Sequence, residues 1–182
     1  LAYKQAVDYA LPCDRITPAD LEDLLGKPPF YRDIYQGNDY AGVVTGRGEV
    51  FKPLQARTDC FGILIWPDVQ SSTKEAYELL DNQKEALSHE CEAWGYEKLA
   101  AQYMAPFKTW RFVNDFQPVL EQRYPVIGRV RKELCEQGAE FAQMSGSGSA
   151  VFGLFSSETL MASAFEVLAK KWSWCKPFLL LA

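Results

Sequence analysis

The sequence predicts an α+β fold in which helices cover one face of a mainly antiparallel sheet. Residues 60–66 are a nearly continuous apolar run, as in a central strand, and capped amphipathic stretches follow this run. Strands, helices, strand, helix and strand succeed one another without an internal repeat or low-complexity linker. This order is typical of a ferredoxin-like split βαβ sandwich.

The first third of the chain carries one helix signal and one hairpin signal. Thr17 and Pro18 suit the N-cap and first position of a helix, and Gly26 suits its end. Residues 41–51 contain two short β-prone runs joined by a Gly-Arg-Gly turn at 46–48. We therefore expect a hairpin just before the central strand.

The next part reads as helical. Ser72 and Glu75 have the spacing of a capping box, and the apolar stripe that follows them continues to Leu87. Residues 96–104 and 107–113 are further helical or turn segments. The aromatic side chains of this region are expected in the core rather than as a ligand platform.

A pair of helices is expected after residue 113. Asn114 and Asp115 can cap the first of them, and Pro125 suits the start of the second. Gly138 can then end the second helix in a left-handed conformation. These signals predict a helix pair immediately before the next strand.

The C-terminal part contains three predicted strands. Residues 139–143 and 150–155 are apolar runs that flank a Ser/Gly turn at 144–149, and residues 156–158 open a helix. Residues 177–181 are expected to form a last buried strand.

The Ser/Gly turn is the run whose composition demands a special backbone. Gly146 and Gly148 admit positive φ, and consecutive amides in such a turn can bind an anion together with the hydroxyls of Ser145, Ser147 and Ser149. A tight turn between paired strands explains the same residues. The absence of the lysine of a Walker-type phosphate loop speaks for this simpler interpretation. From composition alone both interpretations stand.

Composition narrows the classes of function. The chain has 182 residues, 48% of them hydrophobic, and a net charge of −5, which argues against a protein whose whole surface binds nucleic acid or an anionic membrane. Five widely spaced cysteines without a C-x-x-C pair fit the reducing cytoplasm. The one histidine, His89, lacks the second histidine of an H-E-x-x-H motif, so no metal site is predicted. No apolar run is long enough to cross a bilayer.

Three runs together resemble a known family. They are VQSSTKEAY at 69–77, NDF at 114–116 followed by YP at 124–125, and GA at 138–139 followed by MSGSGSAVFGL at 144–154, preceded by TGRGE at 45–49. In this order and spacing they resemble the C-terminal, substrate-side half of the 4-diphosphocytidyl-2-C-methyl-D-erythritol kinases, members of the GHMP kinase superfamily.

The resemblance implies an activity and a set of site residues. It implies transfer of phosphate from ATP, with Mg²⁺, to the 2-hydroxyl of the diphosphocytidyl methylerythritol substrate, in the non-mevalonate route to isoprenoids. The loop 145–149 matches the family's third motif, which faces the nucleotide phosphates at the junction of two lobes. Thr73 matches a threonine near the substrate, and Asn114 and Asp115 match the family's Asn-Asp pair. Helix capping explains Thr73, Asn114 and Asp115 as well, and both roles are compatible.

The chain also departs from the family pattern. The nucleotide-cradling motif P-x-x-x-G-L-G-G-G-S-S and the lobe with the catalytic lysine are absent, and residues 26–31, GKPPFY, lack the expected catalytic aspartate. We therefore interpret residues 1–42 as a divergent N-terminal extension or a remnant of the preceding lobe, and residues 43–182 as a GHMP kinase C-terminal domain. The isolated chain is expected to be inactive without that lobe. Another GHMP kinase, such as a mevalonate or homoserine kinase, and a non-catalytic binding module are the alternatives.

Overall fold

A computed structural model describes residues 41–45, 50–83 and 94–179. The chain divides into two compact units, with the boundary in the sequence between Ala56 and Arg57. In the first unit, β1 (Ala41–Thr45) and β2 (Val50–Leu54) pair antiparallel. This confirms the two predicted hairpin strands. Their turn, the helix signal at Thr17 and the end of the stripe at Leu87 lie outside the described residues.

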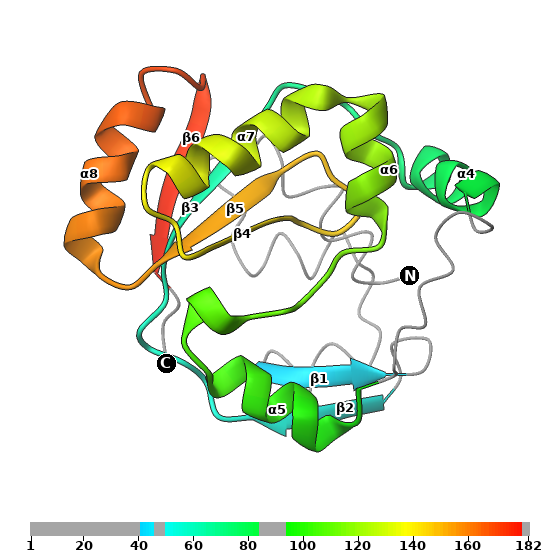
Figure 1. The fold of residues 1–182 in the computed structure, drawn as a ribbon, viewed down its shortest axis with the longest axis vertical. Helices are drawn as coiled ribbons and strands as arrows, with labels where there is room; N and C mark the ends of the chain where they lie inside the picture. Colours follow the sequence, from blue (N-terminus) through cyan, green and yellow to red (C-terminus); the bar gives the residue numbers. More distant parts are fainter. Residues whose placement is uncertain (1–40, 46–49, 84–93, 180–182) are drawn as a thin grey trace, which may run out of the picture. The chain divides into compact units, whose positions relative to one another are not determined.

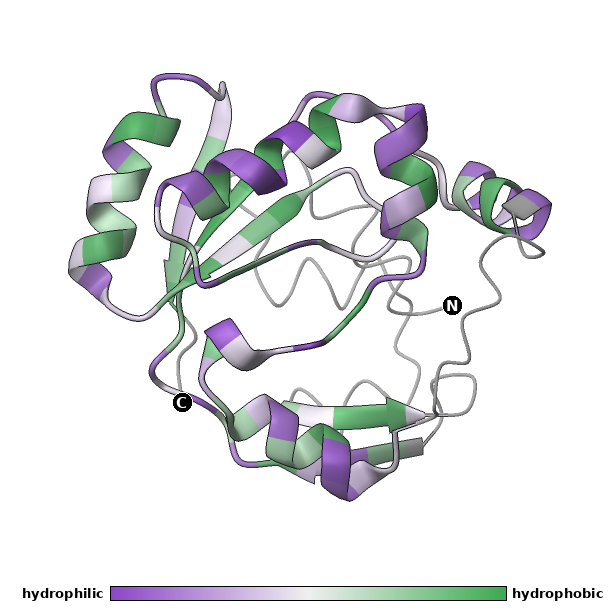
Figure 2. Cartoon of the chain, in the orientation of Figure 1, coloured by the Kyte–Doolittle hydropathy of each residue, from purple (hydrophilic) through white to green (hydrophobic). Residues whose placement is uncertain are grey.

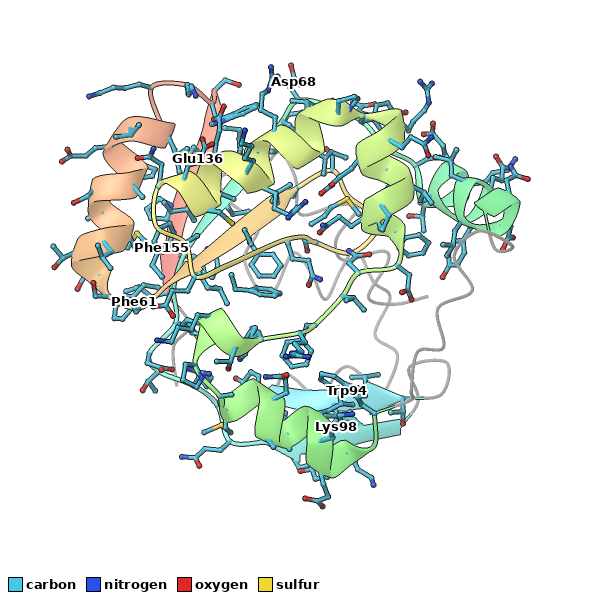
Figure 3. All side chains as sticks on the ribbon, in the orientation of Figure 1. Phe61, Asp68, Trp94, Lys98, Glu136 and Phe155 are labelled. Carbon is cyan, nitrogen blue, oxygen red and sulfur yellow. The ribbon has the colours of Figure 1, made fainter. Side chains whose placement is uncertain are left out.

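The second unit is built on a four-stranded antiparallel sheet with the order β4-β5-β3-β6 (Figure 1). The strands are β3 (Phe61–Trp66), β4 (Phe141–Met144), β5 (Val151–Phe155) and β6 (Trp174–Leu179). The apolar run at 60–66 is therefore a central strand, as predicted, and Ile63 and Ile65 are fully buried. Phe61 and Phe155 are cross-strand partners that lie at one end of the sheet (Figure 3).

The last strand differs from the prediction. β6 begins at Trp174, three residues earlier than expected, and it is an edge strand of the four. Cys175 is buried, but Pro177 and Leu179 are exposed, so the strand is only partly buried. A proline has no N–H to donate to a neighbouring strand. A strand tolerates it best at the edge of a sheet, because an edge strand has a neighbour on one side only.

Helices account for most of the remaining described residues of this unit. They are α4 (Thr73–Gln83), α5 (Tyr96–Met104), the 3-10 helix η1 (Phe107–Thr109), α6 (Phe116–Arg123), α7 (Pro125–Glu136) and α8 (Glu158–Leu168). Each is too short or too polar to cross a bilayer. Ser157 caps α8 by accepting a hydrogen bond from the Leu160 amide at 3.3 Å, as its sequence predicts. Gly138 ends α7 with φ +96°, also as expected.

One face of the sheet is covered by α7 and α8 (Figure 1), which confirms the predicted α+β arrangement. Ile127, Val130 and Leu134 of α7 are fully buried against the strands. Figure 2 shows β3 and β5 mainly as hydrophobic, whereas α7 alternates between hydrophobic and hydrophilic residues, as an amphipathic helix does. Burying each such side chain contributes roughly 1.5–3 kcal/mol to folding.

The opposite face carries a smaller aromatic cluster. Phe107 and Leu154 are buried there. The Arg57 guanidinium lies 4.3 Å from the centre of the Phe107 ring and donates hydrogen bonds of 2.7 Å to the carbonyls of Tyr103 and Ala105. Arg57 thus fixes the junction of α5 and η1 onto the sheet.

Candidate functional site

The loop 145–149 joins β4 to β5 at one end of the sheet. The Ser145 amide donates to the Ala150 carbonyl at 2.8 Å, and the Gly148 amide donates to the Ser145 carbonyl at 2.9 Å. Gly146 and Gly148 have φ of +54° and +80°, which confirms that both need the left-handed region. The loop is therefore a tight turn between paired strands, as one of the two interpretations required.

Close packing adds a second constraint at Gly148. A Cβ atom there would lie 2.8 Å from the Met144 sulfur and 3.1 Å from the Ser71 hydroxyl oxygen. Met144 is itself buried, with 1% of its surface exposed. The backbone of the loop therefore lies directly against buried side chains.

The start of α4 holds the loop from one side. The Ser71 hydroxyl donates to the Ser147 carbonyl at 2.9 Å, and the hydroxyls of Thr73 and Ser147 share a hydrogen bond of 2.9 Å. The buried Ser149 hydroxyl donates to the Val69 carbonyl. Residues from two separate runs of the sequence thus form one hydroxyl network.

Asn114 holds the loop from the other side. Its side-chain amide donates two hydrogen bonds of 2.8 Å, one to the Met144 carbonyl and one to the Gly146 carbonyl. Its side-chain oxygen accepts from the Phe116 amide at 3.0 Å, in the manner of an Asx turn. The residue therefore acts at the start of α6 and in the loop at once.

Adjacent backbone donors of the loop remain available. Among the residues that the structure describes, the amides of Gly146 and Ser147 have no hydrogen-bond partner, and both residues are half-buried. Adjacent unpaired amides in a turn suit an anion such as a phosphate group. The geometry is thus compatible with the phosphate-facing interpretation as well as with the turn.

The same loop offers little to a metal ion. Its recorded hydrogen bonds involve amides, hydroxyls and carbonyls, and no carboxylate. Over the described ranges, no group of three or more His, Cys, Asp or Glu side chains could hold a metal.

A carboxylate fixes α4 beside the helix pair. The Tyr124 hydroxyl donates to both oxygens of Glu75, at 2.9 and 3.0 Å, and this hydrogen bond raises the pKa of Tyr124 above its usual value. Arg123 adds an ion pair to Glu75 at 3.4 Å. The Ser72 hydroxyl accepts from the Glu75 amide at 3.0 Å, so the cap is confirmed, but no return bond from the Glu75 side chain to Ser72 is recorded. Its carboxylate binds across helices instead.

The structure brings most of the predicted site residues together. Ser147 and Ser149, Thr73 and Asn114 lie in one hydrogen-bonded cluster. Asp115 is exposed and makes no side-chain capping bond at the start of α6, so its predicted capping role is wrong. The first α6 amides are instead served by Asn114.

Two positions of the cluster were missed by sequence reasoning. Ser71 bonds the loop carbonyl, and Gln117 accepts from the Met144 amide at 2.9 Å with its side-chain oxygen. Gln117 carries no signal in the sequence, because its partner is 27 residues away. Ser71 lies in the run 69–77, but a serine before a cap is ordinary in a loop.

A family model matches the part of the chain that contains α5 to α8. Residues 98–173 match the model described as "GHMP kinases C terminal". These residues form a GHMP kinase C-terminal domain. Asn114 and the loop 145–149 lie inside the match, whereas Thr73 precedes it.

Two curated relatives of this chain are kinases of the same name. A 4-diphosphocytidyl-2-C-methyl-D-erythritol kinase of Treponema pallidum is 39% identical over 140 residues, which is 74% of this chain and 48% of the relative. The kinase of that name from Thermodesulfovibrio yellowstonii is 35% identical over 136 residues, 71% of this chain and 46% of the relative. The chain thus spans about half the length of the curated relatives it matches.

Solved structures share the fold. A 4-(cytidine 5'-diphospho)-2C-methyl-D-erythritol kinase aligns over 100% of this chain and 78% of its own, with a TM-score of 0.64 and 20% identity. The mevalonate kinase of L. major aligns over 91% of this chain and 59% of its own, with a TM-score of 0.60 and 14% identity. At these identities the likeness establishes the GHMP kinase fold of the chain.

Proposed function

We propose that this chain is the substrate-side part of a kinase that phosphorylates the 2-hydroxyl of 4-diphosphocytidyl-2-C-methyl-D-erythritol with ATP, in isoprenoid synthesis. One observation carries the proposal. Thr73, Asn114 and Ser147 come from the three runs that resemble this kinase, and they meet in a single hydrogen-bonded cluster. The name and 39% identity of the Treponema pallidum relative support the same choice of substrate.

The proposed role of the loop follows from the chemistry of phosphoryl transfer. Such kinases work mostly by positioning and by stabilising charge on the transferred group. Gly146 and Ser147 would direct their free amides to phosphate oxygens. Asn114 would keep the carbonyls of Met144 and Gly146 turned away from the ligand, because it binds both. ATP with its Mg²⁺ would supply the phosphoryl group and part of the positive charge.

Other parts of the proposed reaction need residues beyond this cluster. We assign residues 43–182 to the substrate-side domain and residues 1–42 to an extension or a remnant of the preceding lobe. The base, the lysine and the nucleotide-cradling glycines would come from that lobe. Asp115 would face the substrate from the start of α6, where it is exposed.

The proposal is tested by acceptor choice. The protein encoded by the complete gene is assayed for ATP-dependent phosphorylation of the diphosphocytidyl substrate, of mevalonate and of homoserine. We expect turnover of the first, at least about 100-fold above the others, since a site built for polar groups rejects substrates that lack them. Preference for mevalonate or homoserine would reassign the chain to another GHMP kinase, and no turnover of any acceptor would favour a binding module.

A second assay addresses the 182-residue chain by itself. We expect no phosphoryl transfer with ATP and the diphosphocytidyl substrate, since the base and lysine are proposed to lie in the preceding lobe. Calorimetric titration with cytidine diphosphate then measures the affinity that this half retains. Turnover by the chain alone would contradict the proposal that the base and the lysine lie in the preceding lobe.

A further inference from the structure

The hydroxyls of Thr73 and Ser147 share one hydrogen bond of 2.9 Å, in which either atom could be the donor. Their surroundings differ. Thr73 is buried, with 8% of its surface exposed, and its hydroxyl has no other partner among the described residues. Ser147 is half-buried at the tip of the loop.

Counting protons decides the direction of this bond. Each hydroxyl has one proton, and one of the two is used between them. If the Ser147 hydroxyl donated to Thr73, the proton of the Thr73 hydroxyl would be buried without an acceptor. Such a donor loses its hydrogen bonds to water and gains none in return, which is unfavourable. If Thr73 donates, the Ser147 proton is free to point to the open side of the loop. The second arrangement is therefore the more stable one.

The other polar side chains that donate hydrogen bonds around the loop already have acceptors for their protons. The Ser149 hydroxyl donates to the Val69 carbonyl, and the Ser71 hydroxyl donates to the Ser147 carbonyl. Both amide protons of Asn114 go to loop carbonyls. Within the described residues, the Ser147 proton and the neighbouring unpaired amides are thus left for a ligand, together with the hydroxyl of Ser145, which has no recorded partner.

We propose that Ser147 donates its hydroxyl proton directly to a phosphate oxygen, and that Thr73 is a positioning residue behind it that fixes the direction of that proton. This rests on the proposed function and deepens it, because it separates the residue that contacts the ligand from the residue that orients it. The ligand chemistry is a diphosphate, which ADP and a cytidine diphosphate share. Thr73 then acts through Ser147 and does not touch the substrate.

A double-mutant cycle tests the proposal by binding. The full chain and its Thr73→Val, Ser147→Ala and doubly substituted variants are titrated calorimetrically with inorganic pyrophosphate. We expect Ser147→Ala to weaken binding roughly tenfold, as for a hydrogen bond to a charged group. Thr73→Val should weaken it about threefold in the wild-type background and not at all in the Ser147→Ala background.

A conservative variant separates positioning from folding. Thr73→Ser keeps the hydroxyl donor, so this variant should bind pyrophosphate as tightly as the wild type. If the threonine had only a structural role, the affinities of the variants would instead fall in parallel with their melting temperatures. Parallel titrations with ADP and with cytidine diphosphate show which nucleotide brings the diphosphate, because only that one should lose affinity on Ser147→Ala.

The outcomes distinguish the inference from the function on which it rests. Additive effects of the two substitutions would mean that Thr73 contacts the ligand itself, and an unchanged affinity of Ser147→Ala would mean that backbone amides alone bind it. Either result overturns the inference and leaves the proposed function standing. No binding of pyrophosphate, ADP or cytidine diphosphate by the wild-type chain would also overturn the inference. The proposed function is judged separately, by the acceptor assay on the protein encoded by the complete gene.

Discussion

The starts of α4 and α8 are built from the same local pattern but serve different purposes. In each, a serine caps the helix: Ser72 for α4 and Ser157 for α8. In each, another serine precedes the cap. Ser71 donates to the loop carbonyl of Ser147, whereas Ser156 is exposed and has no recorded partner among the described residues.

The difference shows how a shared local signal becomes a site. Capping is decided within four residues and gives both helices their first turn. The bonds of Ser71 and Thr73 depend on a loop more than 70 residues away in sequence. Only at α4 does the helix start have a partner that needs its hydroxyls.

Removing the loop's other anchor should have the largest effect. Asn114→Asp replaces two donors with a carboxylate 2.8 Å from two carbonyl oxygens, and we expect a loss of about 3 kcal/mol in the free energy of unfolding. Urea denaturation measures it. Asp115→Asn is the matched control, since this exposed neighbour should change stability by less than about 0.5 kcal/mol. Equal stabilities of the two variants would show that Asn114 is not the anchor.

The serines before the caps test the comparison directly. Ser71→Ala leaves the Ser147 carbonyl without its side-chain donor and should cost about 1–2 kcal/mol. Ser156→Ala should be neutral within about 0.5 kcal/mol, because it removes no recorded bond. Chemical denaturation of both variants in parallel measures the two losses in the free energy of unfolding. Similar losses would contradict the difference that we draw between the two helix starts.

The caps themselves should behave alike. Ser72→Ala and Ser157→Ala each remove one acceptor for a first-turn amide, so each should destabilise the protein by about 1 kcal/mol. Replacement by Asp, which also caps, should restore most of the loss. A cap at α4 that costs several times more than the one at α8 would show that capping and loop binding are coupled.

The smallest expected effect concerns the residues that follow α8, and it depends on pH. Burial raises the pKa of Glu133, but hydrogen bonds from Lys171 and Trp172 outweigh it and hold this pKa below its ordinary value of 4.5. This stabilising contribution is present above the unfolded pKa and is lost as the pH falls through the folded one.

Glu133→Gln keeps an acceptor for Trp172 and removes the titration. We therefore expect the variant to lose less stability than the wild type between about pH 6 and about pH 3. Thermal melting over this range gives both curves. Parallel curves would mean that the Glu133 pKa is the same in the folded and unfolded states.

Local chemistry made much of the fold predictable. The apolar run at 60–66, the serine caps of α4 and α8 and the left-handed glycines of the loop all appear where the sequence indicates them. Each is decided by residues within a few positions of one another. The burial of β6 was predicted wrongly, because an apolar run does not reveal whether its strand lies at the centre or at the edge of a sheet.

The candidate site was predictable as a set of residues, but not as a set of contacts. Resemblance pointed to Thr73, Asn114 and the loop, yet their hydrogen bonds join positions 30 to 74 residues apart. The helix and strand propensities of single residues do not predict which distant positions pair in this way. For the same reason only the structure reveals that Gln117 binds the Met144 amide and that Asp115 does not cap α6.

Arg57 is the first residue of the second compact unit, and this sets a practical limit for cutting the gene. A fragment that starts at residue 57 keeps the guanidinium beside Phe107 and its bonds to Asp59 and to the carbonyls at the end of α5. A fragment that starts at residue 60 removes the cation and leaves those carbonyls to water. The shortest autonomous piece of this protein should therefore begin no later than Arg57.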